Sequence, residues 1–209
     1  MVRNGTGGRR HLILSSNPTV NGLPALRREM RLRRRALSGS RRTLATRAIV
    51  ARIKGLPAFR AAHRIALYWP ADGEPDLREL AAHAWTHGKQ VFLPVVGHAG
   101  AMHFAPWSRH GRLRRNSFGI PEPVARRTTG VTRLDLVIVP LVAFDARCNR
   151  LGMGGGYYDR ALQRRRHRPL LVGAAFALQR VGALPRRPWD IPLDLVVTER
   201  GQHKKGANA

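Results

Sequence analysis

The sequence is poor in several residue types, and each shortage excludes a class of protein. Its 209 residues include a single cysteine, Cys148, so an internal disulfide framework is excluded and a reducing compartment, the cytoplasm, is expected. No apolar run approaches the roughly 20 residues needed to cross a bilayer, so no membrane partner is expected. Aromatic residues make up only 6% of the chain, yet hydrophobic residues reach 43%, which excludes a disordered polycation.

Acidic residues are scarce as well. Twelve Asp and Glu stand against 38 Lys and Arg, which gives a formal net charge of +26. Only four of the basic residues are lysines, and the arginines are spread over most of the chain. Such a charge favours anionic ligands and leaves a non-catalytic nucleic-acid-binding protein as an alternative. Because the arginines are dispersed, a solvated arginine-rich surface is the favoured interpretation.

One folded domain with two unstructured ends is expected from the length and composition. Residues 1–21 are rich in Gly, Asn, Ser, Thr and Arg and are predicted to form a disordered N-terminal extension. Residues 201–209 (GQHKKGANA) are predicted to form a disordered C-terminal tail. The domain between them, residues 22–200, is expected to be a monomer.

Helical and strand-like segments alternate through this domain. Apolar residues at helical spacing predict helices over 23–37, 38–55 and 76–88, and a further helix from about Tyr158. Apolar runs predict strands at 64–70, 90–96, 102–106 (an edge strand), 134–142 (a central strand), 170–176 and 195–198. Most of these runs are apolar throughout, as in sheets covered on both faces. The sequence therefore predicts a three-layer α/β/α fold with a mostly parallel central sheet.

A glycine-rich loop is the most informative local feature. The segment Arg150–Arg160 (RLGMGGGYYDR) places four glycines between a buried strand and a predicted helix start. Glycine lets backbone N–H groups approach an anion closely, and a helix N-terminus adds unpaired donors, so this pattern is typical of a phosphate-binding loop. It matches neither a Walker A loop nor the dinucleotide fingerprint. The alternative is a tight turn with no ligand.

The segment RLGMGGGYYDR resembles the signature of the 5-formyltetrahydrofolate cyclo-ligase family (5,10-methenyltetrahydrofolate synthetase). Three further blocks resemble the family in the same order, and the resemblance covers roughly Leu23 to Glu199. They are RIALYWPADGEPD at 64–76, FGIPEP at 118–123 and WDIPLDLVVTE at 189–199. Four ordered blocks are a stronger signal than the glycine motif alone.

The resemblance implies an ATP- and Mg²⁺-dependent cyclisation of 5-formyltetrahydrofolate to 5,10-methenyltetrahydrofolate, with release of ADP and phosphate. The formyl oxygen is phosphorylated, N10 attacks the activated carbon, and phosphate leaves. ATP is then a co-substrate and Mg²⁺ is the cofactor, and polyglutamylated folates are included among the expected substrates. Phosphoryl transfer of this kind depends mostly on positioning and charge stabilisation, which arginines and a glycine loop supply.

Site residues follow from the resemblance position by position. The matches to ATP-binding residues are Arg27, Arg150, Leu151, Gly152, Met153, Gly154, Gly155, Gly156, Tyr157 and Tyr158. The matches to folate-contacting residues are Trp69, Glu74, Met153, Gly154, Gly155, Gly156 and Tyr157. The matches to Mg²⁺ ligands are Asp159 and Asp194, and the implied catalytic residues are Arg150, Tyr157 and Asp159.

Several of these residues have a structural alternative. Asp159 can cap a helix, Asp194 can be a turn acid, and Trp69 can belong to the core. Tyr157 and Tyr158 can stack on rings or simply fill space. Two aspartates suffice for Mg²⁺, which commonly takes one or two carboxylates together with phosphates and waters.

The first helix departs from the family pattern. The family places a lysine and, about four residues later, an arginine on this helix. Arg27 matches the arginine, but Leu23 occupies the lysine position. Arg28 or Arg31 are the candidates to replace it, although an arginine fork is a different group from a lysine point charge.

Overall fold

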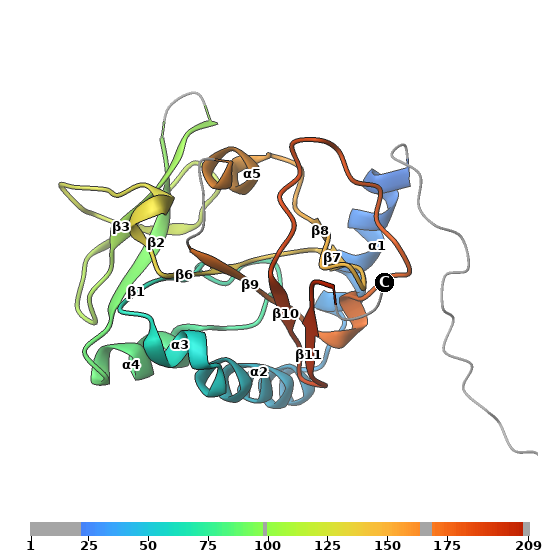
Figure 1. The fold of residues 1–209 in the computed structure, drawn as a ribbon, viewed down its shortest axis with the longest axis horizontal. Helices are drawn as coiled ribbons and strands as arrows, with labels where there is room; N and C mark the ends of the chain where they lie inside the picture. The colour runs from blue at the N-terminus through green and yellow to red at the C-terminus, as the bar shows by residue number, and fades with distance from the viewer. Residues whose placement is uncertain (1–21, 98–99, 164–168, 207–209) are drawn as a thin grey trace, which may run out of the picture.

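The computed structural model describes residues 22–97, 100–163 and 169–206, and these form a central sheet with helices on both faces (Figure 1). Helices α2, α3 and α4 cover the lower face in that view, α5 lies above the sheet, and α1 stands at the far right. The expected three-layer α/β/α fold is confirmed, with α5 as the one α-helix of the upper layer in this part of the chain. The predicted N-terminal extension, residues 1–21, lies outside the described residues.

The sheet has seven strands in the order β11-β10-β9-β6-β1-β2-β3. Its strands are β1 (Arg64–Ala66), β2 (Gln90–Val96), β3 (Met102–Pro106), β6 (Leu136–Val139), β9 (Leu170–Ala174), β10 (Leu195–Val197) and β11 (Gln202–Lys204). The five inner strands run parallel, and β3 and β11 pair antiparallel at the two edges. The mostly parallel sheet is confirmed, including β3 as an edge strand and β6 at the centre.

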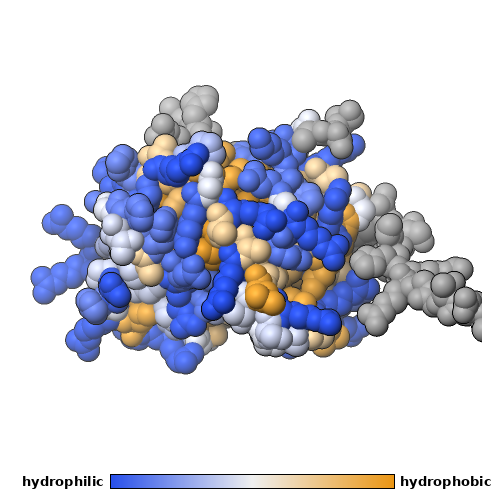
Figure 2. Space-filling model, turned by 90° about the horizontal axis from the view of Figure 1, so that it is seen from below, coloured by the Kyte–Doolittle hydropathy of each residue, from blue (hydrophilic) through white to orange (hydrophobic). Residues whose placement is uncertain are grey.

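Five α-helices surround this sheet in the described residues. They are α1 (Leu23–Arg35), α2 (Gly39–Gly55), α3 (Pro57–Ala61), α4 (Arg78–Thr86) and α5 (Tyr157–Leu162). Gly88 follows α4 with a φ of +68°, a conformation that glycine adopts without the steric cost paid by other residues. Hydrophilic side chains cover much of the face that carries α2–α4 (Figure 2). No helix in the described ranges is both long and apolar enough to span a bilayer.

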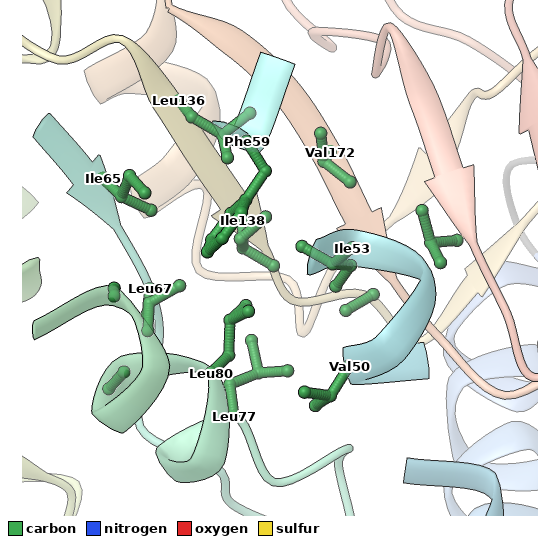
Figure 3. Packing of buried hydrophobic residues seen from close by; sticks show 14 of the residues in the cluster. Val50, Ile53, Phe59, Ile65, Leu67, Leu77, Leu80, Leu136, Ile138 and Val172 are labelled. Atoms are coloured by element: carbon green, nitrogen blue, oxygen red, sulfur yellow. The ribbon is translucent and has the colours of Figure 1, made fainter. Parts of the chain in front are cut away.

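The core beneath α2–α4 explains why these helices stay on the sheet. Ile53 of α2, Phe59 of α3 and Leu80 of α4 are at most 1% exposed and pack against Ile65 of β1 and Ile138 of β6 (Figure 3). Burying one such side chain contributes roughly 1.5–3 kcal/mol. A second cluster on the other face holds α5 against β6 and β9 through Leu162 and its neighbours.

Small elements outside the main sheet carry much of the functional geometry. They are the ribbon β7 (Ala143–Phe144) with β8 (Arg150–Leu151), the ribbon β4 (Leu113–Arg115) with β5 (Pro121–Pro123), and the short helices η3 (Val131–Arg133) and η4 (Ala177–Gln179). The β7–β8 ribbon was not predicted, because the apolar run 134–142 ends before it. Buried Asp145 stabilises its turn by accepting hydrogen bonds from the backbone N–H groups of Arg147 and Asn149.

The prediction of a disordered tail over 201–209 is wrong for its first part. Residues Gln202–Lys204 form β11, which pairs with β10 through Leu195↔Lys204 and Val197↔Gln202. Edge-strand pairing satisfies backbone groups even where the side chains are polar, so a polar composition did not exclude a strand here. Residues 207–209 lie outside the described residues.

Candidate active site

The glycine loop connects the β7–β8 ribbon to α5. Gly154 has a φ of +106° and Gly156 a φ of +65°, both in the region that favours glycine. A Cβ on Gly155 would lie 2.8 Å from the Tyr157 ring, and a Cβ on Gly156 would lie 2.8 Å from Arg160 Nη1. The loop therefore needs glycine for both backbone conformation and space, and its path exposes backbone at the start of α5.

Helix α1 brings Arg27 to this loop from 125 residues away. Arg27 Nε donates to the Gly152 carbonyl at 2.9 Å, and its guanidinium lies about 3.7 Å from where a Gly154 Cβ would be. Burial, with a smaller contribution from the positive charge of Arg187, lowers the pKa of Arg27. Arg27 lies beside Gly154 and Arg150 lies beside Gly152. Their positive charges make the space around the loop favourable for an anion.

The first turn of α1 explains the departure at Leu23. Its side chain is buried beside Val142 and Leu151 of the β7–β8 segment. Of the two candidate replacements for the family lysine, Arg31 is already paired with Asp72 at 2.6 Å, whereas Arg28 is exposed. Leu23 thus anchors the helix that carries Arg27.

Arg150 and Asp159 form an ion pair behind the loop. Arg150 Nη2 lies 2.5 Å from Asp159 Oδ1, and the Arg150 side chain is only 4% exposed. Asp159 Oδ1 also accepts from the Ile191 N–H at 3.3 Å, while Oδ2 accepts no hydrogen bond from any residue that the structure describes. Arg150 Nε is buried and has no hydrogen-bond partner among those residues. A buried unpaired donor costs about 1–3 kcal/mol, and a ligand can satisfy it.

Tyr157 joins the loop to a distant turn. Its ring lies 5.8 Å from that of Phe118 in an edge-to-face arrangement, and the guanidinium of Arg160 lies 5.2 Å from its centroid. Asn116 holds the Phe118 turn by accepting backbone hydrogen bonds at 2.9–3.0 Å. Phe118 is 58% exposed and Met153 is 53% exposed, so an apolar surface borders the glycines.

Glu74 lies in a buried charge network after β1. Its Oε1 is 3.6 Å from Arg34 Nη1, its Oε2 accepts the Ala71 N–H at 3.1 Å, and its side chain is 10% exposed. Arg34 is 1% exposed and also bonds the Leu141 carbonyl and Asp72 Oδ2. Burial raises the pKa of Glu74 to about 7 despite the opposing charge of Arg34. The carboxyl can therefore hold or release a proton near neutral pH.

Tyr158 follows the glycine loop in α5 and is close enough to Glu74 to be affected by its charge. Its hydroxyl is buried without a partner among the described residues, and Arg150 lies 6.0 Å from its ring. Burial, followed by the negative charge of Glu74, raises the pKa of Tyr158, so the hydroxyl remains a donor. Tyr158 therefore lies near the charges of both Glu74 and Arg150.

Two predicted site residues, Trp69 and Asp194, contact residues outside the glycine loop. Trp69 packs edge-to-face on Trp107 at 5.6 Å and borders the core cluster beneath α2–α4. Asp194 precedes β10, and its Oδ2 accepts the Leu171 N–H at 2.8 Å. The described residues hold no cluster of three or more His, Cys, Asp or Glu that would form a metal site by themselves. The roles predicted for Trp69 and Asp194 remain predictions.

Sequence reasoning missed Arg34 and Asp72. The signal was available for Arg34, because it continues the buried stripe of Leu26 and Met30 on α1 at helical spacing. Arg34 was instead expected to belong to the solvated arginine-rich surface of the dispersed arginines. Asp72 carried no periodic signal, since it lies in a turn with a φ of +51°.

Comparison with known proteins gives the lineage. Residues 20–199 match the 5-formyltetrahydrofolate cyclo-ligase family. The chain belongs to this family. A 5-formyltetrahydrofolate cyclo-ligase of Escherichia coli K12 is 40% identical over 174 residues, covering 81% of this chain and 96% of that protein. The Haemophilus influenzae protein of the same name is 37% identical over 179 residues, covering 82% and 95%.

Solved structures agree with the cyclo-ligase assignment. The NMR structure of Aquifex aeolicus 5,10-methenyltetrahydrofolate synthetase superposes with a TM-score of 0.79 at 35% identity, covering 90% of this chain and 95% of that one. The resemblance inferred from the four sequence blocks is confirmed. These relatives are named for folate chemistry, so they favour a cyclo-ligase over the non-catalytic nucleic-acid-binding alternative.

Proposed function

We propose that this cyclo-ligase family member converts 5-formyltetrahydrofolate to 5,10-methenyltetrahydrofolate with ATP as co-substrate and Mg²⁺ as cofactor, acting as a monomer in the cytoplasm. The observation that carries the proposal is the glycine loop held between Arg27 and the Arg150–Asp159 pair, with Glu74 close by. The family relationship supplies the reaction, and a basic glycine loop with a buried carboxyl nearby supports neighbouring sites for an anionic and a polar substrate.

The nucleotide half of the site consists of Arg27 and the segment from Arg150 to Tyr158. Backbone N–H groups of Gly152, Gly154, Gly155 and Gly156, with those of Leu151 and Met153, would approach the phosphates. Arg27 and Arg150 both bring positive charge close to the loop glycines. The unpartnered Arg150 Nε is a donor that a phosphate oxygen would satisfy.

The folate half is proposed to lie between Glu74 and Tyr157. A carboxyl with a pKa of about 7 can pair with the polar edge of a pterin in either protonation state. Tyr157, together with exposed Met153, offers apolar surface for a ring system. Trp69 is assigned to the same pocket by family resemblance, and its contact with Trp107 would fix its orientation.

Asp159 and Asp194 are proposed to hold a magnesium ion. Asp159 holds Arg150 through Oδ1 and leaves Oδ2 without a hydrogen bond among the described residues, and Asp194 is the second proposed carboxylate. Two carboxylates with phosphates and waters meet the usual requirement of this ion. When bound, Mg²⁺ would neutralise charge on the phosphates during transfer.

The chemistry needs positioning more than a protein nucleophile. The formyl oxygen of the folate takes the γ-phosphoryl group of ATP, and ADP is released. N10 then attacks the formyl carbon and loses its proton, and the formyl oxygen leaves with phosphate. In this scheme Arg150 stabilises the transferring charge, Asp159 holds Arg150 in place, and Tyr157 orients the folate ring against the loop.

A coupled assay tests the proposal. The full chain is incubated with ATP, Mg²⁺ and 5-formyltetrahydrofolate while methenyl absorbance and ADP are followed together. Equal amounts of methenyl product and ADP are expected, and both should disappear without Mg²⁺ or ATP. An enzyme preparation that unfolds cooperatively but forms neither product would refute the proposed activity.

A further inference from the structure

A basic groove lies at the opposite end of the sheet from α1. Two adjacent hollows of about 460 Å³ and 390 Å³ share the lining residues Pro106 and Arg127, and we refer to them together as the groove. The larger hollow is lined by the first residues of β1 and β2, Arg64 and Gln90, and thus lies at the amino-terminal ends of these parallel strands. The loops of residues 107–133 that border it lie at the left in Figure 1, far from α1.

Five arginines line this groove, and its lining contains no acidic residue. They are Arg64, Arg112, Arg126, Arg127 and Arg133. The ion pairs formed within the described ranges involve none of the five. The nearby Asp135 carboxylate accepts the backbone N–H groups of His63 and Arg64. Positive charge therefore gathers in a hollow without a matching negative group in its lining.

Arg64 lines the larger hollow and has a buried hydrogen-bond donor. Its guanidinium lies 5.0 Å from the Phe92 ring centroid, and its backbone is fixed by Asp135. Its Nε is buried and has no hydrogen-bond partner among the residues that the structure describes. A buried donor in this state costs about 1–3 kcal/mol. In the larger hollow, the Arg64 guanidinium can donate to an anion.

The groove is distinct from the candidate active site. Its lining residues include none of those assigned to ATP, folate or Mg²⁺. The arginines near the active site are held by protein groups: Arg34 by Asp72, Arg150 by Asp159 and Arg27 by the Gly152 carbonyl. Within the described ranges the side chains of the groove arginines have no such partners, which leaves them available to a ligand.

We propose that this groove binds a chain of phosphate groups, an oligophosphate whose charges are read by Arg64 and Arg133 at one end and by Arg112 and Arg126 at the other, with Arg127 between them. Guanidinium groups and phosphates form charge-assisted paired hydrogen bonds. Ser108, Thr128 and Thr129 add hydroxyl donors along the same walls.

The lining favours an oligophosphate over a nucleic acid. Single-stranded nucleic acids are commonly bound by aromatic side chains on which bases stack. Phe92 is the one aromatic residue among those that line the two hollows, it is only 4% exposed, and the guanidinium of Arg64 lies over its ring. The groove therefore presents donors for phosphates but no open surface for bases.

Titration calorimetry with inorganic tripolyphosphate at low ionic strength, without Mg²⁺, tests the proposal on the full chain. Arg127→Ala/Arg133→Ala removes two exposed groove charges, and Arg41→Ala/Arg47→Ala removes two exposed charges from α2 as the matched control. Arg27→Ala distinguishes binding at the glycine loop. We expect the groove pair to weaken tripolyphosphate binding at least tenfold, and the α2 pair and Arg27→Ala to leave that groove-dependent binding within about twofold.

Three results would overturn the proposal. Equal weakening by the groove and α2 pairs would mean that net charge alone attracts the ligand, and loss of all binding in Arg27→Ala would put it in the glycine loop. A ten-residue thymidine oligonucleotide serves as a second probe near physiological salt. Groove-dependent binding of the oligonucleotide that is tighter than that of tripolyphosphate would replace the oligophosphate with a nucleic acid. Folate turnover by the groove pair should equal that of the wild type.

Discussion

Two arginine-rich regions lie at opposite ends of the same sheet and differ in what holds their charges. At the α1 end, Arg31, Arg34 and Arg35 all bind the carboxylate of Asp72, and Arg34 also reaches Glu74. At the groove end, the lining arginines have no carboxylate partner within the described part of the chain. The same residue type is therefore structural in one region and available to a ligand in the other, which a net charge of +26 cannot distinguish.

At the α1 end, the carboxyl groups of Asp72 and Glu74 have pKa values shifted in opposite directions, although the residues are only two positions apart. Burial opposes ionisation at both. At Asp72, hydrogen bonds from Arg31 and Arg35 outweigh it and lower the pKa, whereas at Glu74 burial prevails and raises the pKa to about 7. Asp72 thus stays charged and fixes the helix, while Glu74 can change protonation near neutrality. One network supplies both an anchor and a titratable group.

The largest expected effect comes from breaking the anchored region. Asp72→Ala would leave Arg34 buried without its main counter-charge, and loss of one partner of a buried pair typically costs about 3–5 kcal/mol. Urea unfolding should show this loss in the free energy of unfolding. Glu29→Ala, which breaks the exposed pair with Arg33, is the matched control and should cost less than about 1 kcal/mol. Similar losses in the two variants would contradict the assigned role of Asp72.

The next effect concerns catalysis at the paired region. Asp159→Asn removes the carboxylate that holds Arg150 and one proposed Mg²⁺ ligand, and misplacement of this kind can lower turnover about 100-fold. The kcat of the coupled assay and its dependence on Mg²⁺ concentration are the measurements. Glu79→Gln, which removes an exposed carboxylate from α4, should keep wild-type turnover. An unchanged kcat and Mg²⁺ dependence in Asp159→Asn would remove the metal assignment.

A change of pH distinguishes the titratable carboxyl of Glu74 from the carboxylate of Asp72, which stays charged. Because its folded pKa of about 7 is above the ordinary 4.5, its contribution to stability is greatest below pH 4.5 and falls as pH rises toward 7, by roughly 3 kcal/mol in all. Glu74→Gln should abolish this fall, so the variant gains stability relative to wild type at pH 8 while losing folate turnover. Urea unfolding at pH 5 and pH 8 tests it. A difference between the two proteins that does not change with pH would contradict the raised pKa.

The sequence predicted the architecture because burial is periodic. Strand β2 was predicted with its observed ends, and α1 and α2 to within two residues, since their apolar positions repeat and Ser38 and Gly55 mark the limits of α2. Strand β1 is shorter than predicted: the run RIALYWP continues to Pro70, but only Arg64–Ala66 pairs along the sheet. Hydrophobicity reports burial, and pairing depends on neighbours that are distant in sequence.

The sequence predicted the glycine loop of the candidate site but not the distant residues that contact and position it. The glycines within 152–156 determine the local backbone conformation, so their pattern can be recognised in the sequence itself. The contact of Arg27 with Gly152, and that of Arg34 with Glu74, joins segments far apart in sequence. The groove was not predicted for the same reason, since Arg64 and Arg133 meet only when β1 and β6 lie side by side.

The smallest effect is expected where arginines have no partner. Arg112→Ala/Arg126→Ala removes two exposed groove charges that form no ion pair in the described residues, so the free energy of unfolding should change by less than about 0.5 kcal/mol and kcat should stay at the wild-type value. Reduced repulsion among the remaining cations would even favour a slight gain at low salt, and added salt should remove that gain. A loss of several kcal/mol would mean that these arginines support the fold as Arg34 does, and the contrast between the two ends of the sheet would fail. If tripolyphosphate binding weakens in this variant while stability and turnover remain unchanged, the groove arginines serve ligand binding and not folding or catalysis.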